Sequence, residues 1–111
     1  MALSDSQRPF SQIIEFTVVP RHQAGLVASL IQQTERFTRT YPGFVSATVE
    51  VSEDGERVIN QVLWQSKSAF EQALENAEAG AQNFYAMLRE HRVTAATFNT
   101  YHIESQILSA R

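Results

Sequence analysis

The feature that most constrains the fold is a β-hairpin placed between two helical stretches. Apolar and polar residues alternate from 45 to 51, which is typical of a strand with one buried face. An acidic turn follows at 53–56, where Gly55 can adopt a positive φ angle. The next stretch, 58–64, carries apolar residues on both sides, so we predict a central strand that is covered on two faces.

One strand and one helix are predicted before this hairpin. Residues 12–19 form a short, β-branched run that favours a strand, and Pro20 marks its end because proline cannot donate to a sheet ladder. Residues 22–40 carry an apolar stripe at helical spacing, which predicts a helix of about five turns. Pro42 and Gly43 oppose the continuation of that helix.

A second helical region and a last strand follow the hairpin. Ser66 is the predicted N-cap of a helix whose apolar stripe extends to Ala77. Gly80 is predicted to break this helix, and residues 82–91 to add a further turn or two. Residues 93–103 alternate loosely between apolar and polar, which predicts a long final strand.

The predicted element order is therefore β-α-β-β-α-β, in a single domain over 1–111 with a loose N-terminal tail at 1–10. This order is typical of the α+β ferredoxin-like fold, in which two helices cover one face of an antiparallel sheet. The other face would leave Ile, Val and Phe side chains in water. We therefore expect a homodimer that buries sheet against sheet.

Composition and charge exclude several classes of protein. The absence of cysteine removes disulfides, zinc-thiolate sites and thiol catalysis. A formal net charge of −3 with scattered basic residues argues against nucleic-acid binding, because phosphate neutralisation supplies most of that affinity. No apolar run approaches the ~18 residues of a membrane span, and the first residues lack the pattern of a signal peptide. We expect a cytoplasmic protein with no membrane partner and, since no histidines and carboxylates show ligand spacing, no metal.

The stretch PGFVSATVEVSEDGERVINQVLWQSKSAFEQAL resembles the signature of the antibiotic biosynthesis monooxygenase family. The matching features run from the start of the hairpin into the following helix: Pro42, Gly43, Phe44, the Asp54–Gly55 turn, Asn60, Trp64, Ser66 and Phe70. The resemblance implies ferredoxin-like subunits that form a dimeric α/β barrel. In the best-known branch it also implies oxidation of phenolic or anthrone-like molecules to quinones, with O₂ and without a cofactor.

The resemblance implies a pocket between the sheet and the helices, with catalytic groups on the second strand of the hairpin. Asn60 supplies amide N–H groups and Trp64 a ring face and an indole N–H, both on one face of the strand and about 13 Å apart. Such donors can stabilise a developing oxyanion. His91 is the third candidate, because imidazole suits proton transfer near neutral pH. The residues expected to contact substrate are aromatic: Phe70, Phe84 and Tyr85.

A structural interpretation stays open for each of these residues. Trp64 can be a packing residue over a helix start, and Asn60 can satisfy backbone groups. His91 fits a surface position at a helix C-terminus, and Tyr85 fits a core position.

The chain also departs from the family pattern. Phe70 stands where polyketide-oxidising members tend to have a tyrosine, and Phe84 and Tyr85 fall where an arginine is expected. Tyr85, Arg89 or His91 are the candidate replacements as donors. Haem degradation is disfavoured, because Leu74 occupies the position where that branch needs a histidine.

The two remaining histidines are interpreted as structural. His22 is predicted to begin the first helix and to be exposed. His102 lies near the end of the last predicted strand with Glu104 on the same face, which fits an edge ion pair more often than a catalytic dyad.

Three functions follow from these observations. The first is a cofactor-independent monooxygenase that oxidises an aromatic phenol or quinol with O₂. The second is a non-catalytic dimer that binds a hydrophobic small molecule, which the absence of the tyrosine favours. The third is a non-oxidative enzyme of the same superfamily, such as an isomerase or lyase.

Overall fold

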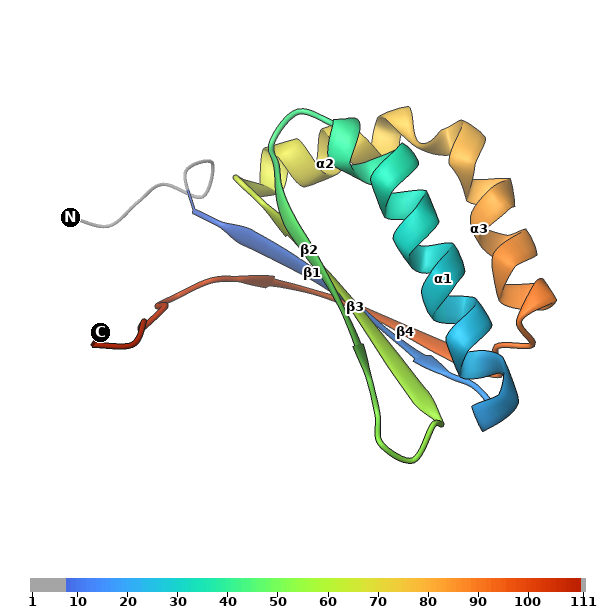
Figure 1. Ribbon diagram of the computed structural model, residues 1–111. Helices are drawn as coiled ribbons and strands as arrows, with labels where there is room; N and C mark the ends of the chain where they lie inside the picture. The colour runs from blue at the N-terminus through green and yellow to red at the C-terminus, as the bar shows by residue number, and fades with distance from the viewer. Residues whose placement is uncertain (1–7, 111) are drawn as a thin grey trace.

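The computed structural model describes residues 8–110, except for the side chains of residues 78–82. The predicted N-terminal tail lies mostly outside these residues, and the first strand already begins at Phe10. The elements, in chain order (Figure 1), are β1 (Phe10–Thr17), α1 (Pro20–Arg36), a short 3-10 helix (Thr38–Thr40), β2 (Phe44–Val51), β3 (Arg57–Trp64), α2 (Lys67–Asn76), α3 (Glu78–Glu90) and β4 (Ala95–His102).

The four strands form one antiparallel sheet in the order β2-β3-β1-β4. All three α-helices lie on the same face of this sheet, with α1 and α3 side by side and α2 over one end (Figure 1). The predicted ferredoxin-like fold is therefore confirmed. The sheet is open, and β2 and β4 form its edges.

The helix break between α2 and α3 lies at Ala77 and not at Gly80. Ala77 has φ −94° and ψ 8°, and its backbone N–H bonds to Leu74 O as α2 ends. Helix α3 then runs through Gly80 to Glu90. A glycine inside a helix destabilises it by only about 1 kcal/mol relative to alanine, which tertiary packing of the helix can offset.

The first helix also begins earlier than predicted. Pro20 is the first residue of α1, a position that suits proline because its missing N–H would have no helical partner there. The helix ends at Arg36, and the 3-10 turn replaces the last turn of the predicted long helix.

The core consists of two clusters on the helix-facing side of the sheet. The first, the Phe16 cluster, lies under α1 and the C-terminal half of α3 and comprises Ile14, Phe16, Val18, Leu26, Leu30, Val58 and Met87. The second, the Trp64 cluster, lies under α2 and comprises Phe10, Val62, Trp64 and Ala73. Of the candidate site residues, Trp64 belongs to the Trp64 cluster and Phe70 packs against it, whereas Phe84 packs against the Phe16 cluster.

The face of the sheet away from the helices is only partly covered. Its central polar contact is a hydrogen bond from Gln61 Nε2 to Ser11 Oγ at 3.0 Å. Its apolar residues include the half-buried Ile13, Ile59 and Leu63. The predicted cover of β3 on both faces is therefore not met within one chain. No helix in the described part of the chain is long and apolar enough to cross a bilayer.

Candidate active site

Strand register places the candidate residues in rows on the helix-facing side of the sheet. In one row Trp64 lies opposite Phe10, and Phe10 lies opposite His102. Two residues further along the strands, a parallel row contains Val62, Gln12 and Thr100, and the next contains Asn60, Ile14 and Phe98. Opposed residues of antiparallel strands share a face, so Asn60 and Trp64 both face the helices, as predicted.

Asn60 and Trp64 are both enclosed, and each has a polar atom without a partner. Asn60 is 9% exposed and Trp64 2% exposed. Neither Asn60 Oδ1 nor Trp64 Nε1 has a hydrogen-bond partner among the described residues. Burying an unpaired polar group is unfavourable by about 1–3 kcal/mol, and such groups are rare in folded proteins. Asn60 Oδ1 and Trp64 Nε1 therefore each have a hydrogen-bonding capacity that no described residue uses and that a substrate oxygen could use.

Aromatic rings surround Trp64. Its ring centroid lies 6.0 Å from that of Phe44 and 6.3 Å from that of Phe70, in edge-to-face geometry. Phe70 also lies 5.2 Å from Phe10. These edge-to-face contacts pack the indole among aromatic side chains.

The position of Phe70 follows from the start of α2. Ser66 Oγ accepts the Ala69 backbone N–H at 3.1 Å, so the predicted N-cap is confirmed. Gly43, with φ +84°, lets α2 approach the start of β2: a Cβ there would lie 2.4 Å from Ala69 Cβ. The close approach turns Phe70 onto the Trp64 row.

Phe84 and Tyr85 lie on α3, towards the other end of the sheet. The Phe84 ring lies 6.2 Å from Phe16 and 6.0 Å from Phe98, so it packs over the row that contains Asn60. Tyr85 is 59% exposed, so the interpretation of Tyr85 as a core residue is wrong.

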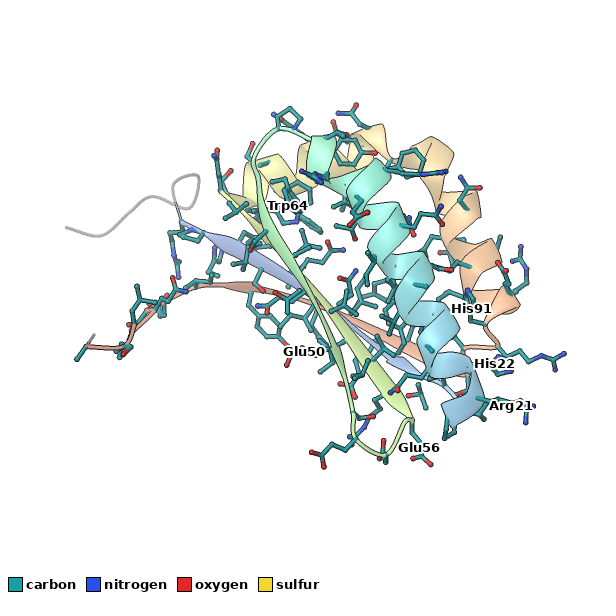
Figure 2. The ribbon with its side chains drawn as sticks, viewed as in Figure 1. Arg21, His22, Glu50, Glu56, Trp64 and His91 are labelled. Atoms are coloured by element: carbon teal, nitrogen blue, oxygen red, sulfur yellow. The ribbon has the colours of Figure 1, made fainter. Side chains whose placement is uncertain are left out.

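The structure does not bring His91 to Asn60 and Trp64. His91 ends α3 beside α1, where its Nε2 lies 2.8 Å from Ser29 Oγ and its ring closely approaches Gly25. Trp64 and His91 lie at different ends of the domain (Figure 2).

The other two histidines differ from their predicted roles. Glu104 pairs with Arg8 and not with His102. The His102 ring instead packs on Phe10, with centroids 5.1 Å apart, and its Nδ1 is enclosed without a partner among the described residues. His22 is half-buried and not exposed, and its Nε2 is similarly enclosed. Sequence reasoning assigned His102 to an edge ion pair, and the signal that places it in the Trp64 row is the cross-strand register.

Two surface hollows of about 280 and 270 Å³ lie outside this region. The first is lined by α1 and α3, with Arg36 and Glu90 at its polar rim, and the second lies between α1 and β2. Neither is lined by Asn60 or Trp64. Within the described residues, no group of three or more histidines and carboxylates could hold a metal ion.

The fold defines a class: a small ferredoxin-like domain whose helices cover one face of a four-stranded antiparallel sheet. Residues 9–83, more than half of the sequence, match the model of the family described as antibiotic biosynthesis monooxygenase. The chain belongs to this family.

Several similar proteins come from streptomycetes. The chain is 43% identical over 68 residues to tetracenomycin-F1 monooxygenase of Streptomyces glaucescens, and the match covers 61% of this chain and 61% of that protein. A monooxygenase from the ActVA-Orf6 gene of Streptomyces coelicolor, solved with nanaomycin D, has a similar fold with a TM-score of 0.81, 24% identity and coverage of 94% and 95% of the two chains. SnoaB of Streptomyces nogalater, a cofactor-independent oxygenase, has a TM-score of 0.70 at 21% identity, with coverage of 96% and 100%.

Proposed function

We propose that this protein is a cofactor-independent monooxygenase that oxidises an aromatic phenol or quinol with O₂. The observation that carries the proposal is the pair of enclosed, unpaired atoms, Asn60 Oδ1 and Trp64 Nε1, on one face of β3. Membership of the family and the monooxygenase names of the similar proteins support the oxygenase chemistry.

The two unpaired atoms have complementary hydrogen-bonding properties. An indole N–H is only a donor, so Trp64 suits a carbonyl or phenolate oxygen of the substrate. A carboxamide oxygen is an acceptor, so Asn60 suits a substrate hydroxyl. The Cα atoms of the two residues are about 13 Å apart along the strand. The substrate that fits best is therefore an elongated aromatic molecule that carries oxygen at both ends.

Cofactor-free oxidation needs little from the protein beyond binding and electrostatics. An electron-rich phenol that has lost its proton can itself reduce O₂. The site must hold the ring, exclude water and stabilise negative charge on the substrate oxygen. Phe44 and Phe70 would hold the ring, and the Trp64 N–H would bond the oxyanion.

The test is oxygen consumption by the metal-free protein. We expect O₂ uptake and quinone absorbance with a panel of anthrones and quinols in air. Trp64→Phe should lower kcat about 100-fold, the typical effect of losing one oxyanion-stabilising group. Asn60→Ala should also lower kcat, because the substrate hydroxyl loses its acceptor, while the circular dichroism spectrum of both variants is unchanged. Absence of turnover across the panel by the intact protein would refute the proposal.

A non-catalytic small-molecule binder is the second candidate. The observation that favours it is Phe70, which contacts Trp64 and Phe10 and has no hydroxyl to transfer a proton. A ligand that stays bound through purification, together with no oxygen consumption, would decide for this function.

We also propose that the protein is a homodimer that acts in the cytoplasm. The half-buried apolar residues Ile13, Ile59 and Leu63 on the open face support a second copy packed against the sheet. After β4 the chain extends away from the domain (Figure 1), where Ile107 and Leu108 are 92% and 76% exposed. Ile59→Arg should convert a dimer to a monomer in analytical ultracentrifugation, and a wild-type monomer at micromolar concentration would refute the dimer.

A further inference from the structure

We propose that His102 is the proton acceptor of this site, an inference that rests on the proposed oxygenase function. His102 is the last residue of β4 and lies opposite Phe10, which in turn lies opposite Trp64. All three side chains therefore face the helices. Two strand spacings separate His102 from Trp64, about 10 Å between Cα atoms, and Phe10 lies between them in the same row.

The His102 ring is held in a fixed orientation, and one of its nitrogens is unused. Its edge-to-face contact with Phe10 has an interplanar angle of 70° and a centroid distance of 5.1 Å. Its Nδ1 is enclosed and has no partner in the described part of the chain. The sheet face that carries Asn60 and Trp64 thus carries a third unpaired polar atom, and this one belongs to a base.

The charged groups around His102 are already paired or face solvent. Arg8, before β1, and Glu104, after β4, bond to each other, so the carboxylate beside His102 has its own cation. On α2, which packs over this end of the sheet, the charged side chains of Lys67, Glu71 and Glu75 are exposed. An imidazole without a carboxylate partner has a ring nitrogen available to accept a proton from a substrate hydroxyl.

The other candidate bases do not reach this row. Phe70 has no ionisable group. His91 bonds to Ser29 on α1, and Tyr85 lies on α3 beside Phe84, over the other end of the sheet. His102 therefore fills the role for which the sequence offered no residue near Trp64.

In the proposed reaction, His102 accepts and returns the protons, and O₂ accepts the electrons. His102 first takes the phenolic proton, and two electrons pass from the ring carbon of the phenolate to O₂ as a C–O bond forms. The imidazolium then protonates the distal oxygen of the peroxide. His102 then removes the remaining proton from the same carbon, so that a C=O bond forms there and the O–O bond breaks. The released hydroxide takes that proton from His102 and leaves as water. The substrate gains one oxygen atom as a carbonyl and loses two hydrogens, and O₂ supplies both the inserted oxygen and that of the water.

The experiment compares His102→Gln with His22→Gln. Both variants replace a histidine that has an enclosed, unpaired ring nitrogen, but His22 lies on α1, outside the site. We expect His102→Gln to lower kcat on a hydroxyanthrone at least 100-fold at pH 7, the usual contribution of a general base, and His22→Gln to change kcat less than twofold. The loss should shrink as the pH rises above the pKa of the substrate hydroxyl, because the substrate then ionises without help.

A binding measurement separates this inference from the proposed function. A hydroxyanthraquinone does not react with O₂, and its absorption moves to longer wavelength when it ionises. Wild-type protein should bind it as the anion at pH 7, and His102→Gln should bind it in the neutral form. If wild type turns over but His102→Gln keeps its kcat and pH profile, His102 is not the base. If wild type neither turns over nor shifts the absorption, the oxygenase proposal fails with it. His102→Asn provides a second variant if His102→Gln does not fold.

Discussion

Replacing Asn60 by leucine should make the protein more stable and less active. Leucine has the same branched shape as asparagine and no polar atoms, so it removes the unpaired Oδ1 from a site that is only 9% exposed. Loss of that unpaired group should contribute about 1–3 kcal/mol in favour of the folded state, and imperfect packing of the leucine should offset about 1 kcal/mol of it. The net expectation is a gain of about 1–2 kcal/mol, or roughly 5–10 °C in Tm for a domain of this size.

Urea denaturation measures this change. The protein concentration is kept fixed, because the stability of a dimer depends on concentration. The midpoint should rise at constant slope, and oxygen uptake should fall in the same variant because the substrate hydroxyl loses its acceptor. Gln23→Leu is the control, because the Gln23 amide is paired: its Nε2 donates to Ser52 O at 3.3 Å and to Arg57 O at 3.0 Å. That variant should lose about 1–2 kcal/mol. Equal destabilisation by both substitutions would show that Asn60 Oδ1 is satisfied in the protein, and the argument for a ligand site would fail.

Three further outcomes test local contacts of the fold. Gly43→Ala should destabilise the protein by about 3 kcal/mol in urea denaturation. The positive φ at this position is unfavourable for alanine, and the new Cβ would overlap with Ala69 Cβ, 2.4 Å away. Ser66→Ala should remove about 1 kcal/mol with the N-cap of α2, and an unchanged midpoint would contradict the cap. The Ser52 hydroxyl holds the pKa of Asp54 below its usual range. The ionised Asp54 carboxylate therefore stabilises the folded state above the pKa of the unfolded chain, and this stabilisation is lost as the pH falls through the pKa of the folded state. Ser52→Ala should raise that pKa in an NMR titration.

Local patterns predicted the strands well because each strand carries its own period. The hairpin and the N-cap at Ser66 are confirmed, since both depend on residues only a few positions apart. The predicted helix break at Gly80 was wrong because it also rested on a local preference alone. Gly80 is the weakest local helix former, but tertiary packing of α3 outweighs a propensity difference of about 1 kcal/mol, and the chain turns at Ala77 instead.

Contacts between distant segments could not be predicted in the same way. His102 and Glu104 are neighbours in sequence, which suggested an ion pair, but Glu104 pairs with Arg8. His102 meets the Trp64 row only because β1 lies between β3 and β4 in the sheet. A register shift of one residue in β4 would turn His102 to the opposite face, so its place in the site depends on pairing that no short stretch of sequence encodes.

The unpaired atoms of the site also connect stability to ligand selectivity. A substrate oxygen that bonds Asn60 Oδ1 or Trp64 Nε1 relieves an unfavourable burial, which is worth roughly 1–3 kcal/mol for each atom. Since 1.4 kcal/mol corresponds to a factor of ten in Kd, an analogue without that oxygen should bind about 10–100-fold more weakly. Isothermal titration calorimetry with naphthoquinones that do and do not carry a ring hydroxyl measures the difference. A pocket that recognised only the flat apolar rings of Phe44 and Phe70 would bind both with the same Kd, and that result would assign Asn60 and Trp64 to packing alone.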